Sequence, residues 1–528
     1  MSFYNKMQQT VNNVSVTENG MVGYKTTYHP LVDMNFRISS YRNMSESNIA
    51  EDFVAILKDT NDSKYALRFL FMVRDAREGL GERRLFRVCI NELIKHMNDD
   101  NIVKSIIDEY IPEYGRYDDL LVFMDTKHED YLIESLKKQL LDDFTGMQNG
   151  TPISLLAKWM PSINGKHNAR KLALKIAKKF GSSEKEYRQL MSSLRAYLDL
   201  VEVKTSDNKW GDINYNTVPS RANLKYKNAF LKHDEERRRE YLAKLVVGDK
   251  SVKINSSVNF PHDIVSKYMG NGWSYRVQAY DETLEQLWKN LPEMEGMNNT
   301  IVVRDGSGSM YQTIQPGSKV QAIDVATALT VYCAERLQGD FKNKFITFSS
   351  RPQMVDLTEF SSLHSKLAHL VGYDDCSNTN LESVFDLILK TAKDHNMKQE
   401  EIPSQIMIVS DMEFDGATTN RNTGNVIEAA AEKFASAGYE LPKLVFWNVC
   451  SRTTTIPCKY NKNGVLLVSG FSVNVIKMVM NGETDPYEAL IKELNSDRYN
   501  KIPEIKIVYN NVKKNTSRAK LTNRPSWL

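Results

Sequence analysis

The chain has 528 residues, of which 41% are hydrophobic and 10% aromatic, and its formal net charge is +3. This composition excludes general disorder, and the length exceeds what one hydrophobic core normally supports, so we expect at least two folded parts. No apolar stretch approaches the ~20 residues that cross a bilayer, the first residues lack the apolar core of a signal peptide, and the five cysteines contain no CxxC pair. These features predict a cytoplasmic protein with reduced thiols, no membrane partner and no zinc site.

The first 295 residues or so carry helical patterns. A continuous apolar block at residues 67–73 predicts a buried helix, and the spaced apolar residues at 85–94 predict an amphipathic one. Further segments of helical length follow, separated by Pro, Gly and Asn: 102–110, 130–142, 154–159, 170–180, 187–202 and 233–246. Although no strict repeat period is present, we expect an antiparallel stack of HEAT-like helix pairs.

Basic residues are concentrated in this helical part. Residues 151–250 contain 21 Lys and Arg against 11 Asp and Glu, a net charge of +10, so the rest of the chain carries −7. Such a concentration favours a nucleic-acid partner, because Lys and Arg pair with phosphates. Aromatic residues that can stack on unpaired bases lie among them: Tyr187, Tyr197, Trp210, Tyr215 and Tyr226.

Ten of the basic residues form the predicted RNA-binding set: Arg170, Lys171, Lys175, Lys178, Lys179, Arg188, Arg195, Arg221, Lys225 and Lys227. The alternative is an ordinary solvated face of helices, neutralised in part by Glu184, Glu186 and the acids at 234–236. The last segment, 505–528, adds six basic residues and no acidic one, which predicts a flexible basic arm.

The C-terminal half alternates between strand and helix patterns. Apolar runs of strand length lie at 301–303, 344–348, 405–409, 443–449 and 465–468. Helical patterns follow at 320–337, 381–392, 426–437 and 487–494. This alternation predicts a doubly wound parallel sheet, whose ligands bind beyond the carboxyl ends of the strands. The predicted fold class is therefore an all-α helical-repeat part followed by an α/β part.

Three polar segments fall where such a sheet binds its ligands. The run 305–309, Asp-Gly-Ser-Gly-Ser, follows one strand, Asp411 follows another, and a polar loop at 374–380 leads into a helix. Asp305 supplies negative charge, Ser307 and Ser309 supply neutral oxygens, and the intervening glycines let the backbone turn. Mg²⁺ takes only oxygen ligands, so the pattern predicts a divalent-cation site with an open position for an acidic ligand. Simple loop capping is the alternative.

These segments resemble the metal-ion-dependent adhesion site of von Willebrand factor A domains, whose pattern is Asp-x-Ser-x-Ser, then a loop Thr, then a strand-end Asp. The resemblance implies that the ligands of Mg²⁺, Mn²⁺ or Ca²⁺ are Asp305, Ser307, Ser309, Thr379 and Asp411, the last acting through water. Ser377 in the same loop is an alternative to Thr379. The chain departs from the family pattern after Asp411, where Met412 stands in place of the usual Gly.

Two segments of the helical half, 74–83 and 114–120, resemble the TROVE module of the Ro ribonucleoproteins, which a von Willebrand A domain follows. They are closer still to an uncharacterised family of the same layout, which also resembles this chain at 17–20 and 444–448. The resemblance spans nearly the whole chain. It implies an N-terminal arm at 1–35, a TROVE-like domain at 36–295, an A domain with the metal site at 296–504 and a basic tail at 505–528.

The Ro resemblance implies an RNA-binding, ribonucleoprotein-like scaffold or RNA quality-control chaperone. Ro proteins bind structured RNAs on the outside of a helical ring and single-stranded ends of misfolded RNAs through its centre. One alternative is a scaffold whose metal site grips an acidic residue of a protein partner without RNA. Another is a metal-dependent hydrolase, in which Glu413 or Asp375, both expected to be exposed loop acids, acts as the base. No Walker loop, Gly-x-Ser-x-Gly elbow or paired-His motif occurs, so no catalytic residue is predicted.

Overall fold

The computed structural model describes residues 2–270, 277–294, 297, 299–348, 351–373, 378–416, 426–458, 464–480, 483 and 485–507. The contacts divide the chain into two compact units. The first, which we call the sheet unit, contains Met1–Asp62, Glu78–Leu80 and Ile254–Lys501. The second, the helical unit, contains Ser63–Arg77, Gly81–Lys253 and the residues from Ile502 onward. The packing units therefore have different bounds from the predicted segments 1–35 and 36–295.

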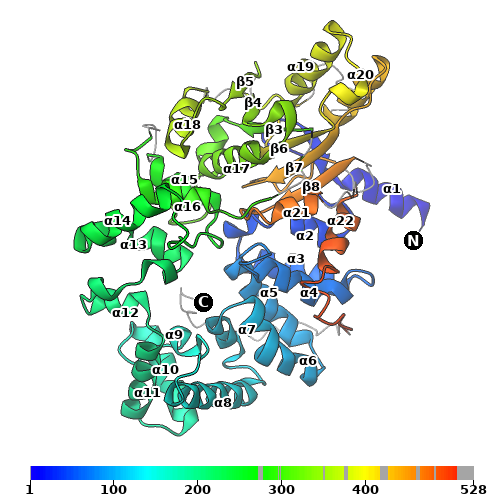
Figure 1. Ribbon diagram of the computed structural model, residues 1–528. Coiled ribbons are helices and arrows are strands. Elements are labelled where there is room, and N and C mark those ends of the chain that lie inside the picture. Colours follow the sequence, from blue (N-terminus) through cyan, green and yellow to red (C-terminus); the bar gives the residue numbers. More distant parts are fainter. Residues whose placement is uncertain are drawn as a thin grey trace. The chain divides into compact units, whose positions relative to one another are not determined.

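The main sheet of this unit has six strands among the described residues, and Figure 1 labels them. They are β3 (Thr300–Asp305), β4 (Lys344–Phe348), β5 (Met354–Asp356), β6 (Gln405–Ser410), β7 (Lys443–Asn448) and β8 (Val465–Ser469). Their order is β5-β4-β3-β6-β7-β8, and only the β4–β5 pair is antiparallel. The expected parallel strands are confirmed. The edge strand β5 was not predicted, because three residues with a single buried side chain carry no clear pattern.

Helices cover both faces of this sheet, as continuous burial along β3 requires. Ile301 and Val303 share a core with α19 (Leu381–Asp394) and α20 (Val426–Ser436). Arg304 points to the other face, where its Nη1 donates to Thr327 Oγ1 of α17 (Ala322–Arg336) at 2.9 Å. Every residue of α17 from 322 to 334 is buried. The predicted helices of this half are confirmed as α17, α19, α20 and α22 (Pro486–Leu494), whereas α18 (Leu363–Leu370) and α21 (Val475–Met480) were not predicted.

The start of the chain packs on the sheet. It forms α1 (Phe3–Asn12), a hairpin of β1 (Val14–Val16) and β2 (Val22–Tyr24), α2 (Pro30–Phe36) and α3 (Glu46–Lys58). The backbones of Tyr24 and Ile456 exchange two hydrogen bonds of 2.9 and 2.8 Å. Asn448, at the end of β7, donates from Nδ2 to the carbonyl of Phe36 at 2.8 Å. Residues 1–62 are thus part of the sheet unit, as are α15 (Pro261–Tyr268) and α16 (Glu282–Lys289).

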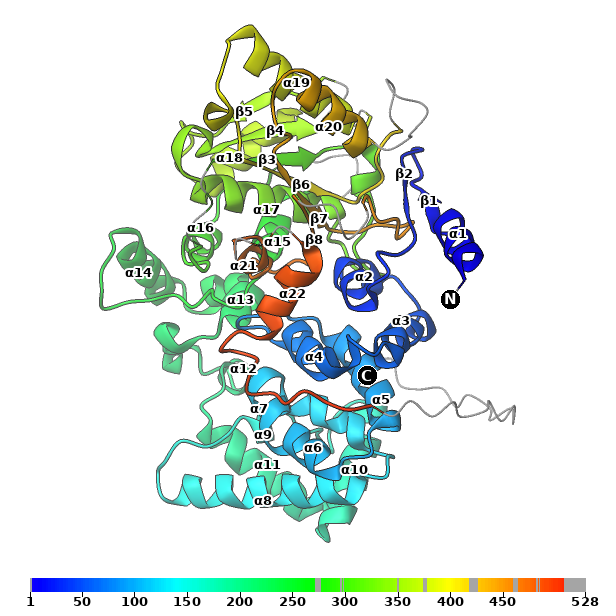
Figure 2. The same ribbon diagram turned by 90° about the vertical axis from the view of Figure 1, so that its right-hand side faces the viewer.

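The helical unit contains eleven α-helices among the described residues: α4 (Ala66–Arg74), α5 (Arg83–His96), α6 (Asp100–Ser105), α7 (Ile111–Tyr114), α8 (Glu129–Gln148), α9 (Leu156–Trp159), α10 (His167–Phe180), α11 (Glu184–Tyr197), α12 (Val201–Ser206), α13 (Ser220–His233) and α14 (Glu235–Val246). Helices α8, α10 and α11 pack against one another (Figure 2). A capping box between Ser183 and Glu186 starts α11. The single helix predicted at 187–202 is wrong, because Asp199 adopts a positive φ of 51° and separates α11 from α12. Helix α13 was not predicted.

In the part of the chain that the structure describes, no helix is both long and apolar enough to span a bilayer. Four cysteines, Cys89, Cys333, Cys450 and Cys458, are free thiols and buried. Cys376 lies outside the described residues.

Candidate functional site

The loops that follow β3 and β6 meet because the two strands are neighbours in the sheet. The register that pairs Arg304 with Val409 places Asp305 beside Ser410. The Ser410 hydroxyl donates to Asp305 Oδ2 at 2.5 Å, and the Ser307 amide donates to Oδ1 at 2.9 Å. Both oxygens of the Asp305 carboxylate are therefore held in place.

The two predicted serines connect Asp305 to Asp411. The hydroxyls of Ser307 and Ser309 lie 2.9 Å apart, and Ser309 also hydrogen-bonds to the Asp411 side chain. Asp411 Oδ1 accepts from the Glu413 amide at 3.2 Å. The side-chain Nε2 of Gln312 lies 3.5 Å from Asp411 Oδ2 and 3.1 Å from the carbonyl oxygen of Cys450. The structure thus brings together four of the five predicted metal ligands.

Both aspartates are fully buried, and this changes their protonation. Burial, together with the negative charge of Asp305, raises the pKa of Asp411 to about 8. Burial also raises the pKa of Asp305, against the opposing hydrogen bonds from Ser410 and Ser307. Two adjacent carboxylates in a poorly solvated place disfavour each other's ionised form. A divalent cation between them would remove that cost.

The donor set fits a hard cation. Asp305 and Asp411 supply charge, and Ser307 and Ser309 supply neutral oxygens, which is the ligand chemistry that Mg²⁺ and Mn²⁺ accept. Among the described residues, no group of three or more His, Cys, Asp or Glu is placed to hold a metal. A cation here would therefore depend on two carboxylates completed by hydroxyls and water, as the sequence pattern predicts.

The fifth predicted ligand, Thr379, has other partners. Its hydroxyl lies 2.7 Å from the carbonyl oxygen of Glu413 and 3.1 Å from Asp415 Oδ1, and it accepts from Asn19 Nδ2 at 2.9 Å. The hydroxyl is thus tied to the loop after β6 and to the N-terminal hairpin. A ligand role for Thr379 stays a prediction, and the alternative, Ser377, lies outside the described residues.

Glu413 is not the exposed loop acid that the sequence suggested. Its side chain is fully buried. Its carboxylate accepts from the amides of Glu18, Arg452 and Thr453 at 2.9 to 3.1 Å. These bonds join the N-terminal hairpin to the loops after β6 and β7, so Glu413 is a structural residue and a poor candidate for a general base. The other candidate base, Asp375, lies outside the described residues.

Sequence reasoning missed three residues of this site: Ser410, Gln312 and Asn19. Ser410 would follow from the strand register, because it is the lateral neighbour of Asp305. Gln312 comes shortly after the Asp-Gly-Ser-Gly-Ser run, but nothing in its spacing points to Asp411. Asn19 hydrogen-bonds to Thr379, which is 360 positions away in the sequence, and no local sequence pattern predicts that contact.

The predicted RNA-binding residues have unequal surroundings in the helical unit. Lys175 pairs with Asp125 at 2.6 Å and with Glu129 at 2.7 Å. Lys179 pairs with Asp130 at 2.8 Å and with Glu129 at 3.3 Å. These two lysines join α10 to the start of α8, and their charge is largely compensated.

Arg195 has hydrogen-bond partners within the helical unit, and its role in RNA binding stays a prediction. Its guanidinium donates to the carbonyls of Ala157 and Met160 at 2.8 and 2.7 Å and to the Ser162 hydroxyl at 2.7 Å. Burial lowers its pKa. Since its donors satisfy the segment after α9, Arg195 is occupied within the unit.

The other residues of the predicted RNA-binding set are better placed to contact an external partner. Lys171, Lys178 and Arg188 are exposed, and among the described residues they have no ion pair. Arg170 is exposed and lies 3.9 Å from Glu184. The three basic residues of α13 are at least partly exposed: Arg221, Lys225 and Lys227. The basic tail beyond residue 507 lies outside the described residues.

Two of the five aromatic residues cannot stack on a base. Tyr187 and Tyr215 are buried, with 1% and 5% of their surface exposed. Trp210 is half-buried and stacks on His233 at a centroid distance of 4.5 Å. Tyr226 is also half-buried, whereas Tyr197 is exposed. Tyr197 is therefore the aromatic residue of this set that an unpaired base could reach most easily.

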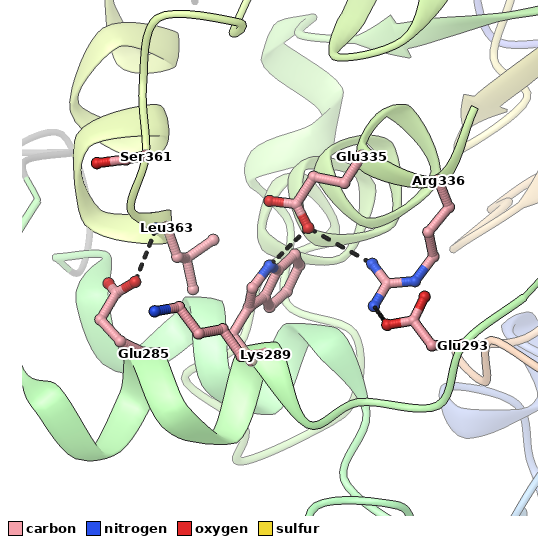
Figure 3. A pocket seen from close by; sticks show the side chains of 8 residues that line it. Glu285, Lys289, Glu293, Glu335, Arg336, Ser361 and Leu363 are labelled. Atoms are coloured by element: carbon pink, nitrogen blue, oxygen red, sulfur yellow. Dashed lines mark hydrogen bonds and ion pairs between the residues drawn. The ribbon is translucent and has the colours of Figure 1, made fainter. Parts of the chain in front are cut away.

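A cavity of about 270 Å³ lies elsewhere in the sheet unit (Figure 3). Its carboxylates have structural partners. Glu285 accepts from the Leu363 amide at 2.8 Å, and Glu335 accepts from Trp288 Nε1 at 2.9 Å and pairs with Arg336 at 3.4 Å. These contacts hold α16, α17 and α18 together, and none of the predicted site residues lines the cavity.

Comparison with known proteins gives the family. Residues 122–298 match a domain of unknown function (DUF2828), and residues 299–523 match a second one (DUF7788). The chain is 30% identical over 512 residues to Uncharacterized protein L728 of Acanthamoeba polyphaga mimivirus, across 89% of this chain and 85% of the viral protein. It belongs to the same family as that viral protein. The boundary between the two matched domains directly precedes β3. Neither the domain descriptions nor the name of the viral protein states an activity.

Proposed function

We propose that the sheet unit is a von Willebrand A-type domain that binds a divalent cation at the ends of β3 and β6 and uses it to hold an acidic ligand. The observation that carries this proposal is the convergence of two buried carboxylates, Asp305 and Asp411, through the hydroxyls of Ser307 and Ser309. A bound Mg²⁺ would supply positive charge and an exchangeable coordination position. The chain's own residues would position the ion and compensate its charge.

Isothermal titration of the full chain with Mg²⁺ and Mn²⁺ tests this proposal. We expect one cation-binding site, which is lost in Asp305→Asn. The control is Asp356→Asn, which changes an exposed aspartate of the same unit and should keep the site. Equal binding by Asp305→Asn and the wild-type chain would refute the metal site.

The second candidate function is RNA binding by the helical unit, which would make the protein a Ro-like ribonucleoprotein with HEAT-like repeats. It is favoured by the exposed Lys171, Lys178 and Arg188 on α10 and α11, which no described carboxylate neutralises. RNA retained by the purified protein, measured by the ratio of absorbance at 260 and 280 nm, separates this function from a protein-only scaffold. Phosphate release from RNA with Mg²⁺ tests the hydrolase alternative, for which the buried Glu413 offers little support.

A further inference from the structure

The two sequence segments that resemble Ro proteins meet inside the helical unit, around Asp119. This residue is fully buried. Arg74 Nε donates to its Oδ2 and Arg87 Nε to its Oδ1, each at 2.7 Å. The Arg116 amide adds a third hydrogen bond at 3.0 Å. Asp119 thus fixes α4 and α5 relative to the segment that follows α7.

Asp118 links the buried Arg87 to the more exposed Arg116. Its Oδ2 lies 2.9 Å from Arg87 Nη2 and 2.6 Å from Arg116 Nη2, and its Oδ1 accepts from Arg116 Nε at 2.9 Å. Two guanidinium groups therefore share one carboxylate oxygen and lie side by side. Arg116 also stacks over the Trp159 ring, 3.9 Å from its centroid. Both arginines are held in fixed orientations before any ligand arrives.

The ion pairs of this network join more guanidinium groups than carboxylates. Arg74, Arg87 and Arg116 are paired with two aspartates, Asp118 and Asp119. Within these ion pairs, three guanidinium groups face two carboxylates.

Arg83 adds a fourth guanidinium group on the same helix as Arg87. It lies one helical turn before Arg87 on α5, so the two side chains share a face of the helix. Arg83 is exposed, and among the described residues it has no ion pair. Desolvation by the surrounding protein and the charges of Arg116 and Arg87 lower the pKa of Arg83, whereas Asp118 and Asp119 oppose this change.

We propose that Arg83 and Arg116, with Arg87 behind them, form a binding site for a phosphate monoester group. Guanidinium groups match phosphate oxygens through paired hydrogen bonds. A phosphate monoester carries about −1.5 to −2 charges at neutral pH and can therefore pair with more than one guanidinium group. Because Asp118 and Trp159 already hold Arg116 in place, little side-chain freedom is lost on binding. The site depends neither on the proposed cation nor on the basic residues of α10 and α11.

The test uses the full chain and inorganic phosphate as the probe, titrated calorimetrically against chloride at equal ionic strength. We expect saturable binding to the wild-type chain, weakened about tenfold or more in Arg83→Gln, since each charge-assisted hydrogen bond contributes strongly. Arg83→Lys keeps the charge but loses the forked geometry of the guanidinium, so its phosphate affinity should lie between those of the wild-type chain and Arg83→Gln. The matched control is Lys138→Gln, which removes one exposed charge from the same unit and should bind as the wild type does.

A second arm identifies the source of the phosphate. Short RNAs with a 5′-phosphate or a 5′-hydroxyl are compared on the wild-type chain and Arg83→Gln. A preference for the phosphorylated end that disappears in the variant assigns the site to RNA ends. Equal binding of both RNAs, with inorganic phosphate still bound through Arg83, assigns it to a small phosphorylated compound. Phosphate binding that is absent, or that is unchanged in Arg83→Gln, overturns the proposal. The phosphate result stands apart from the proposed RNA function, because it is read without RNA.

Discussion

Ser410 donates a hydrogen bond of 2.5 Å to Asp305 across two neighbouring parallel strands, and this contact fixes the carboxylate at the centre of the candidate metal site. Asp305 is fully buried, so removing the hydroxyl would leave Oδ2 without its partner. We expect Ser410→Ala to lower the free energy of unfolding by about 1–3 kcal/mol in EDTA, measured by urea denaturation. Ser436→Ala, at an exposed position of α20, is the control and should change it by less than about 0.5 kcal/mol.

Asp411→Asn should separate metal binding from folding. The substitution keeps the shape of the side chain but removes a charge that lies beside Asp305 in a buried place. We expect Mn²⁺ affinity to fall at least as far as the about 10- to 100-fold that changes around metal ligands typically cost. The metal-free variant should unfold at the same temperature as the wild-type chain or higher at about pH 8. Retained Mn²⁺ affinity would remove Asp411 from the site.

The metal-free protein should lose stability as the pH rises. Asp411 loses its proton near 3.8 in the unfolded chain, whereas its pKa in the folded chain is about 8. Between these values the folded state binds more protons than the unfolded state, so the free energy of unfolding falls with rising pH. The raised pKa of Asp305 acts in the same direction.

Mg²⁺ should reverse this trend, because it competes with the proton for the same carboxylates. The rise in melting temperature on adding Mg²⁺ should therefore be larger at about pH 8 than at about pH 5. Thermal melts of the wild-type chain and Asp305→Asn, with Mg²⁺ and with EDTA, measure this difference. A rise that does not depend on pH, or that persists in Asp305→Asn, would contradict the shared site.

The sequence predicted the parts of this fold whose signal is local. The five parallel strands and four of the helices of the sheet unit follow from runs and periodicity, and Asp305 and Asp411 follow from their places after strands. Contacts between distant segments could not be predicted in this way. Burial of Glu413 depends on a hairpin near the start of the chain, and the Arg195 guanidinium donates to carbonyls 35 and 38 positions away in the sequence. Charge alone does not say which way a side chain points.

Glu413→Gln should destabilise the sheet unit. The carboxylate accepts from the amides of Glu18, Arg452 and Thr453, and a carboxamide would turn an N–H group toward some of these donors. We expect a loss of about 2–3 kcal/mol in the free energy of unfolding, measured by denaturant titration. The exposed Glu359→Gln is the control, with an expected change within about 0.5 kcal/mol. A stable Glu413→Gln with altered Mg²⁺-dependent hydrolysis would instead support a catalytic role.

Replacing Lys171, Lys178 and Arg188 together with Glu should weaken RNA binding without unfolding the helical unit, because these side chains are exposed and make no described ion pair. Lys175 and Lys179 are left unchanged, since Glu at either position would repel Glu129 and destabilise α8 and α10. On single-stranded RNA each lost phosphate contact reduces the slope of log affinity against log salt by about 0.7, so the triple variant should lose about 2 from that slope.

The matched control replaces three exposed lysines of the sheet unit with Glu and should keep the wild-type slope: Lys342, Lys390 and Lys393. Filter binding at several salt concentrations measures both variants. Equal slopes for the wild-type chain and the first variant would place any RNA contact outside α10 and α11.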